Sequence, residues 1–237
     1  TMNALEERLI SELAEVTDLI EKNQEIKCVI LTGYGRAFCA GGDINRFKNG
    51  FTTIEGVNYV DNIHNWVRKF TNLSIPTIAA VNGYALGAGF SIALFCDMII
   101  ASEEAKFGEA FVNVGIIPDL ANLYYLPRLI GLQRAKELVF TGRNITAEEA
   151  FEMGIVNRVT KAEDLYAETA KLAEKIAEGP TVAIATAKKM LNQSLNMGIN
   201  ELIEMESFAQ GVCFQTEDSN EAINAFLEKR KPLFKGK

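Results

Sequence analysis

The sequence predicts an α/β fold in which strands and helices alternate first and helices dominate last. Short apolar runs at residues 27–32, 75–81 and 98–101 have the length of buried strands, and helical patterns separate them. From residue 162 onward nearly the whole chain has helical periodicity. This order is typical of βαβ units followed by a helical C-terminal part.

Composition narrows the class of protein. The 237 residues are 48% hydrophobic and 23% charged, as expected for one large soluble globular domain or one domain with a short appendage. A net charge of −7 argues against a nucleic-acid-binding surface, and the apolar runs are shorter than a membrane span. The four cysteines lack metal-ligand spacing and no signal peptide is recognised, so a reduced, cytoplasmic protein is expected.

The first elements are a helix and a strand. Residues 5–23 repeat apolar side chains at helical spacing, and Asn3 with Glu6 three residues later predicts a capping box. The strand at 27–32 is followed by two close glycine clusters between residues 33 and 42. Such clusters predict irregular backbone with positions free to take positive φ.

A polar segment and a second helix come next. Residues 47–56 are expected to form a mobile loop, and residues 56–73 a helix. That helix carries His64, the only histidine of the chain. A lone histidine on an amphipathic helix is more often structural than catalytic.

The middle of the chain combines a strand, a glycine turn and a helix. The strand at 75–81 leads to Gly87, Ala88 and Gly89, and a helix is predicted to start at residues 90–94. Glycines before a helix let backbone approach a ligand, and the first helical N–H groups can stabilise an oxygen that becomes negative. The alternative is a tight turn whose glycines serve packing alone.

The second half reads mainly as helices. Residues 106–114 could be strand or turn, whereas Pro118 and Asp119 occupy positions favoured at a helix start and predict a helix over 119–129. The other predicted elements are helices at 133–141, 146–153 (with Thr146 as cap), 164–178, 181–197, 199–216 and 220–229, and a short strand at 155–159.

Several chemistries find no support. The chain has neither a GxxxxGK[ST] phosphate loop nor an HExxH metal motif, and its glycines at 83, 87 and 89 do not form GxGxxG. A Ser/His hydrolase would depend on His64 alone. No cluster suggests a metal site.

The motifs together resemble one family. Residues 38–43 match the FxAGxD loop of the enoyl-CoA hydratase/isomerase (crotonase) superfamily, and residues 75–89 are similar to its second signature. The resemblance covers essentially the whole chain and specifies the family without specifying one reaction. Asn3-Ala4-Leu5 resembles the family's NAL at its first helix, so the usual first strands are expected to precede Thr1.

The resemblance implies a spiral of ββα turns over residues 1–180 and a helical C-terminal region over 181–237 that forms trimers, often paired into hexamers. It implies an acyl-CoA thioester substrate, with CoA as part of the substrate and no separate cofactor. Neither nucleic acid nor membrane is implied as a partner.

The resemblance also assigns roles to residues. The two oxyanion-hole N–H groups would be those of Gly42 and Ala88. The residues expected to contact the substrate around them are Ala40, Gly87, Gly89, Ser91 and Phe111. Arg36 is a candidate for the CoA phosphates, as is the basic tail at 229–231.

The departures from the family pattern point to the reaction. The two glutamates of the hydratases correspond here to Ser91 and Phe111, neither of which is a useful base near neutral pH. Asp119 matches the catalytic aspartate of several isomerases of the family and the nucleophilic aspartate of its dehalogenase branch; the alternative role is a helix cap. Glu109 is a possible second carboxylate, expected to be solvated or salt-bridged outside the pocket.

These observations favour an enoyl-CoA isomerase in which Asp119 moves a proton from C2 to C4 of the acyl chain. One alternative is a hydratase or other lyase that uses Asp119 or Glu109. The other is a catalytically weak acyl-CoA-binding protein.

Overall fold

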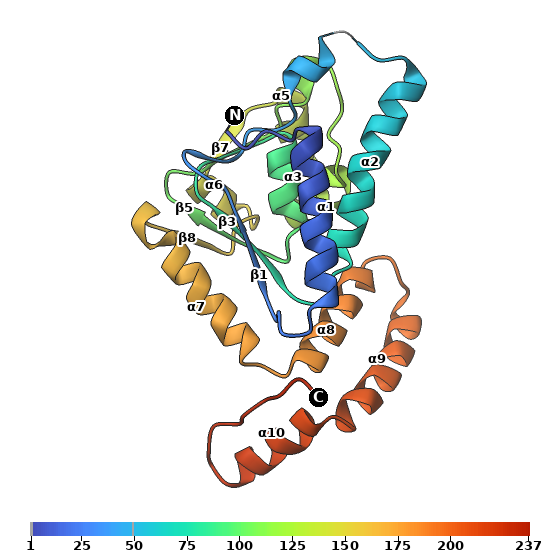
Figure 1. Cartoon of the computed structure of the whole chain (residues 1–237), viewed down its shortest axis with the longest axis vertical. Coiled ribbons are helices and arrows are strands. Elements are labelled where there is room, and N and C mark those ends of the chain that lie inside the picture. Colours follow the sequence, from blue (N-terminus) through green and yellow to red (C-terminus); the bar gives the residue numbers. More distant parts are fainter. Residues whose placement is uncertain (1, 49) are drawn as a thin grey trace.

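The computed structural model describes residues 2–48 and 50–237 and contains two four-stranded sheets with helices packed around them (Figure 1). The predicted α/β class is confirmed. Strands of the two sheets alternate along the chain from residue 29 to residue 108, because each strand of the first sheet in that range is followed by a strand of the second. This alternation is the ββα spiral that the resemblance implies.

The first sheet is the centre of the core. It consists of β1 (Val29–Thr32), β3 (Thr77–Val81), β5 (Met98–Ser102) and β8 (Arg158–Thr160), in that order and all parallel. All five residues of β3 are buried. Helix α7 (Leu165–Ala177) packs on one face, where Leu165 joins Ile78 and Ile100. Both faces are covered, which is why these strands read as continuous apolar runs.

The second sheet holds three-residue strands that the sequence did not predict as a set. β2 (Ala37–Cys39), β4 (Tyr84–Leu86) and β6 (Lys106–Gly108) are parallel, and β7 (Asn144–Thr146) pairs antiparallel with β6. Each parallel strand ends beside the start of a loop that contributes to the pocket described below. The short sheet therefore positions the site.

Helices α1 (Glu7–Lys22) and α2 (Thr53–Thr71) lie side by side (Figure 1). The buried Trp66 of α2 donates its indole N–H to Thr17 Oγ1 of α1 at 3.1 Å. The predicted Asn3 cap is wrong: the N-cap is Glu6, without a side-chain hydrogen bond. The Asn3 amide instead donates to the carbonyls of residues 34, 37 and 38, because these long-range acceptors lie beside it.

The segment predicted as a mobile loop is partly ordered. Residues 44–47 form a 3₁₀ turn, and α2 begins at Thr53 after a capping box between Thr52 and Glu55. The helix therefore starts three residues earlier than predicted. Residue 49 lies outside the described residues.

Two helices follow the central strands. α3 (Ala88–Phe95) is buried along its whole length, and α4 (Asn122–Ile130) begins three residues later than predicted. Leu120 and Ala121 both adopt left-handed φ values, of 51° and 60°, so the chain turns irregularly before α4. α5 (Leu132–Thr141) follows directly, and α6 (Ala147–Glu152) has the predicted Thr146 cap.

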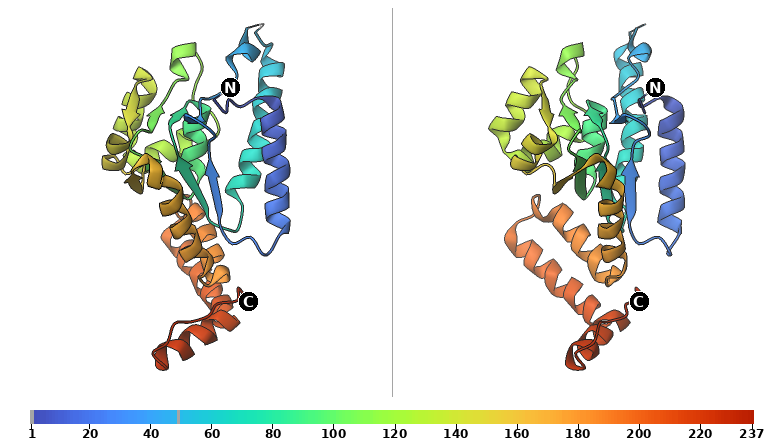
Figure 2. Two further views of the ribbon diagram at one scale, coloured as in Figure 1. Left: turned by 60° about the vertical axis from the view of Figure 1, so that its left-hand side comes forward. Right: turned by 90° about the vertical axis from the view of Figure 1, so that its left-hand side faces the viewer.

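Helices α8 (Thr181–Ser194), α9 (Ile199–Phe214) and α10 (Glu217–Leu227) extend away from the sheets as an arm (Figure 2). Neither α8 nor α9 has a buried residue. In the part of the chain that the structure describes, no helix combines the length and apolarity required to cross a membrane.

Candidate active site

A small, mainly apolar pocket of about 100 Å³ lies where the loops after β2, β4 and β6 meet. It gathers most of the site residues predicted from the sequence, namely Gly42, Ala88, Ala40, Gly87, Phe111 and Asp119. The other lining residues are Leu5, Gly41, Ile44, Tyr59, Ile63, Ala110, Val114, Ile116 and Leu120. These six predicted site residues therefore come from three turns of the spiral and meet in one place.

The two glycine loops are in close contact. Gly41 has a φ of 101°, and a Cβ on it would lie 3.0 Å from the Leu86 oxygen and 3.8 Å from the Ala88 nitrogen. Gly87 has a φ of 51° and is the N-cap of α3, so Ala88 is the first helical residue. The first N–H groups of a helix have no partner within it. The loop that carries Gly42 thus lies against the positive end of the α3 dipole.

The N-terminal residues fix the first of these loops. The Leu5 N–H donates to the Gly41 oxygen at 2.8 Å, and the Ala40 N–H donates to the Met2 oxygen at 3.1 Å. Leu5 also lines the pocket. Its role had no signal in the sequence beyond its place in the NAL triplet, because the contact joins residues about 36 positions apart.

Asp119 is the carboxylate that lines the pocket. Its Oδ1 is buried and has no hydrogen-bond partner among the described residues, and burial raises the pKa of this group to about 6. The alternative role as a helix cap is wrong, since α4 begins at Asn122 and its N-cap is Ala121. Asp119 instead precedes the left-handed pair Leu120 and Ala121.

Glu109 contradicts the expectation of a solvated or salt-bridged carboxylate. It is 1% exposed, and its Oε1 accepts a hydrogen bond from Asn122 Nδ2 at 2.8 Å. Burial, and then the charge of Asp119, raise its pKa to about 7 against the opposing effect of the Asn122 bond. The reason for the wrong expectation is that β6 ends at Gly108, so Glu109 turns inward.

Asn122 is a site residue that sequence reasoning missed. It is fully buried, and its Nδ2 also donates to Ser91 Oγ at 3.2 Å. Ser91 lies on α3 beneath the pocket and is not among its lining residues. The available signal was an asparagine three residues after Asp119, but an asparagine there reads equally well as a surface residue of a helix.

Phe111, which the resemblance matches to one of the hydratase glutamates, lies at the pocket. Its ring lines the pocket, at 3.9 Å from the Cβ position of Gly87. Gly89 does not line the pocket: a Cβ on it would lie 2.0 Å from the Cys39 oxygen, so this glycine allows α3 to pack on β2.

The predicted cationic residues lie outside the pocket. Arg36 is exposed, and its Nε contacts Met2 Sδ at 3.3 Å. In the basic tail, Arg230 pairs with Glu221 and Lys231 pairs with Glu178. His64 lies next to the pocket-lining Ile63 but does not line the pocket itself, and burial lowers its pKa.

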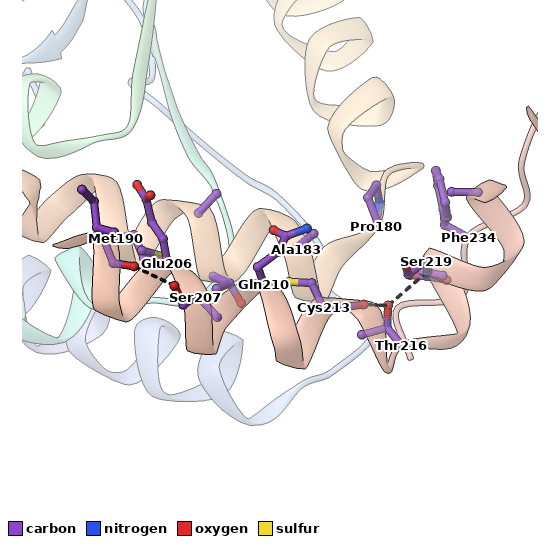
Figure 3. A pocket seen from close by; sticks show the side chains of 16 residues that line it. Pro180, Ala183, Met190, Glu206, Ser207, Gln210, Cys213, Thr216, Ser219 and Phe234 are labelled. Carbon is purple, nitrogen blue, oxygen red and sulfur yellow. Dashed lines mark hydrogen bonds between the residues drawn. The ribbon is translucent and has the colours of Figure 1, made fainter. Parts of the chain in front are cut away.

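A larger hollow of about 730 Å³ lies between α8, α9 and α10 (Figure 3). Its walls are mostly apolar, and its Asp218 carboxylate already accepts hydrogen bonds from the backbone of residues 235 and 236. The small pocket is the better candidate for chemistry, because its Asp119 carboxylate has a buried oxygen without a partner among the described residues. Within residues 2–48 and 50–237, no group of three His, Cys, Asp or Glu side chains is placed to hold a metal ion.

This fold matches known structures. The chain superposes on an enoyl-CoA hydratase subunit from Geobacillus kaustophilus with a TM-score of 0.94 at 38% identity, covering 100% of this chain and 91% of that one. It superposes on an enoyl-CoA hydratase from Bacillus anthracis with a TM-score of 0.93 at 37% identity, covering 99% and 91%.

Sequence comparison agrees. The family profile described as enoyl-CoA hydratase/isomerase matches residues 1–237, and the chain belongs to this family. It is 41% identical to the short-chain-enoyl-CoA hydratase of Clostridium acetobutylicum, over 97% of this chain and 88% of the relative. It is 35% identical to the 1,2-epoxyphenylacetyl-CoA isomerase of Escherichia coli, over 100% and 91%.

Proposed function

We propose that this chain is an enoyl-CoA isomerase that shifts a double bond through a thioester enolate. The observation that carries the proposal is Asp119, a pocket-lining carboxylate whose Oδ1 is buried and lacks a partner among the described residues. The resemblance matches Ser91 and Phe111 of this chain to the two glutamates of the family's hydratases. Asp119 is therefore the carboxylate best placed to act on a substrate in this pocket.

The proposed reaction starts from a 3-enoyl-CoA. Asp119, as the carboxylate, removes a proton from C2, and the electron pair delocalises onto the thioester oxygen and C4. The N–H groups of Gly42 and Ala88 stabilise that oxygen, and each donor of this kind contributes about 3 kcal/mol. The protonated Asp119 then returns its proton to C4 and leaves a 2-enoyl-CoA. No atom is gained or lost.

The environment of Asp119 supports a base of this kind. Its pKa of about 6 is closer to neutral pH than the ordinary value for an aspartate, because burial disfavours the charged form. A base works best when its pKa is near the working pH. The side chains of Ile44, Val114 and Ile116 at the same pocket give an apolar surface suited to an acyl chain.

A second candidate is an enoyl-CoA hydratase. The curated relative at 41% identity is named a short-chain-enoyl-CoA hydratase, and Glu109 supplies a second buried carboxyl near Asp119. Against this candidate, Glu109 does not line the pocket, so it could not hold a water against the substrate directly.

One assay separates these candidates and the third, an acyl-CoA-binding protein without turnover. A panel of 2-enoyl- and 3-enoyl-CoA thioesters is incubated with the protein and followed by mass and by retention time. An isomerase changes retention without changing mass, whereas a hydratase adds the mass of water. A panel in which every thioester stays unchanged would contradict both enzymatic candidates.

We also propose that the arm formed by α8, α9 and α10 mediates a trimer or hexamer. The support is the exposure of its apolar side chains, among them Phe208, Val212, Phe214 and Phe226. Contiguous apolar patches on a soluble protein mark interaction surfaces. Arg36 remains the proposed contact of the CoA phosphates, as an exposed cation on the segment that leads to the Gly42 loop.

A further inference from the structure

A buried hydrogen-bond chain links three elements beneath the pocket. Asn122 at the start of α4 donates to Glu109 after β6 and to Ser91 on α3. All three side chains are at most 1% exposed. None of the three lines the pocket, so any influence on the reaction must act through their neighbours.

This hydrogen-bond chain lacks a donor. Glu109 Oε2 and Asn122 Oδ1 are both buried acceptors without a partner among the described residues. An unpaired buried acceptor destabilises the folded state. A carboxylic acid can give a primary amide two hydrogen bonds, since the amide N–H donates to one carboxyl oxygen and the carboxyl O–H donates to the amide oxygen. A proton on Glu109 Oε2 would supply the missing donor, whereas ionised Glu109 could not.

Asn122 is also attached to the turn that holds Asp119. The backbone N–H of Asn122 donates to the main-chain carbonyl oxygen of Asp119 at 3.0 Å. The two residues between them both have left-handed φ values. Residues without glycine's freedom hold this conformation only when their surroundings impose it. The side-chain bonds of Asn122 are part of what imposes it.

We propose that Glu109 is a positioning residue that works as a neutral carboxylic acid. It holds Asn122, and Asn122 in turn holds the turn that carries Asp119. Ionisation of Glu109 therefore disables the site. This inference rests on the proposed function only in taking Asp119 as the base. It concerns a residue at which the sequence shows no family motif, and it explains why a carboxyl is buried behind the pocket.

The electrostatics agree with this role. Asp119 ionises first, with a pKa of about 6, and burial together with that charge raises the pKa of Glu109 to about 7. Tyr59 of α2, which also lines the pocket, has a pKa raised by burial and then by the Asp119 charge, so it stays neutral over the same range. A charged Asp119 therefore favours the neutral form of Glu109.

The first experiment measures unfolding and needs no substrate. Because the pKa of Glu109 is raised in the folded state above its ordinary value of 4.5, the folded protein should lose stability as pH rises from there to about 7. Glu109→Gln keeps a donor and an acceptor but cannot ionise. Its unfolding midpoint relative to the parent should therefore rise between about pH 5 and about pH 8. Glu103→Gln, which removes an exposed carboxylate, is the control and should show no such rise.

The second experiment measures activity against pH on whichever thioester the panel assay identifies. The parent should gain kcat/KM as Asp119 ionises and lose it as Glu109 ionises. Glu109→Gln should keep the gain and lack the alkaline loss. Glu109→Ala, which removes the bond to Asn122, should lower kcat by about 10- to 100-fold at every pH, with KM little changed, because the base is misplaced.

The two experiments have distinct outcomes. A Glu109→Gln midpoint that follows the parent at every pH overturns the neutral carboxylic acid. An alkaline loss retained in Glu109→Gln overturns its effect on the site. If the proposed function is wrong, Asp119→Asn should keep full turnover. That result would leave the outcome of the unfolding experiment unaffected.

Discussion

Helices α3 and α9 are both rich in apolar residues, yet they lie in opposite surroundings. All eight residues of α3 are buried, whereas none of the sixteen residues of α9 is. α3 lies inside the spiral with its N-terminus at the pocket, and α9 lies in the arm (Figure 2). The contrast shows that an apolar helix sequence indicates burial in the native assembly. It does not indicate whether the same chain or another molecule buries the helix. The core covers α3, and we propose that another copy covers α9.

The sharpest test of the core side of this contrast is Asp119→Asn. The substitution keeps the size of the side chain and removes the base, so turnover should fall by about 100- to 10,000-fold. Exchange of the C2 protons with deuterated water should fall as well, because enolate formation precedes any later step. Circular dichroism and CoA affinity should stay near the parent values.

Ser91→Ala is the matched variant on α3 and should cost much less, because Ser91 does not line the pocket. Near-normal turnover by Asp119→Asn on every accepted substrate would remove Asp119 from the role of base.

The arm side of the contrast is tested by Phe208→Glu. Phe208 is 81% exposed in the single chain, and a charge buried there between copies would lack a partner. Losing a buried contact to an unpaired charge costs about 3–5 kcal/mol, which is more than 100-fold in association. Light scattering at micromolar protein should show a trimer or hexamer for the parent and a smaller species for the variant.

Tyr34→Glu is the control, since Tyr34 is 92% exposed and lies outside the arm. A parent that scatters as a monomer would contradict the proposed assembly.

The packing of α3 and α9 can be compared through one glycine in each helix. A Cβ on Gly89 of α3 would lie 2.0 Å from the Cys39 oxygen, whereas a Cβ on Gly211 of α9 would meet nothing within 4 Å. Gly89→Ala should lower the free energy of unfolding by about 1–3 kcal/mol, through displaced backbone. Gly211→Ala should raise it by about 0.5–1 kcal/mol, because alanine favours a helix. Equal unfolding midpoints for the two variants would refute this account of the packing.

The smallest effect is expected at Arg36. It is an exposed cation, and exposed charge pairs contribute about 0.2–1 kcal/mol. Arg36→Ala should therefore weaken CoA binding, measured by calorimetry, by a few-fold at low salt and less at high salt. Lys171→Ala removes an exposed cation from α7 and serves as the control. Equal dissociation constants for the two variants would place the CoA phosphates elsewhere.

The sequence predicted the long elements and the residues of the pocket better than the short elements. The strands at 77–81 and 98–102 were recognisable because a short apolar run with turn residues beside it is typical of a buried strand. The three-residue strands β2, β4 and β7 have no periodicity to recognise, and their partners lie up to about 47 positions away. Their existence depends on tertiary contacts that no local pattern encodes.

The errors near the site have a common physical cause. Asn3 and Glu109 are polar residues beside predicted elements, where a cap or a solvated surface is the usual outcome. Each instead makes a contact distant in the sequence. Family motifs could indicate that Gly42 and Ala88 share a pocket, but the partnership of Glu109 with Asn122 lies outside those motifs.

The spiral brings the pocket together from loops made in sequence, after β2, β4 and β6, and this has a consequence for the order of folding. The central sheet pairs β1 with β3, β3 with β5 and β5 with β8, always in parallel, so its contacts join distant segments and should form slowly. A growing chain completes the amide groups of Gly42 and Ala88 well before Asp119 has been added. During refolding of the whole chain, helix content should return early because its contacts are local, and the ability to retain a thioester should return last because the pocket needs the non-local sheet contacts.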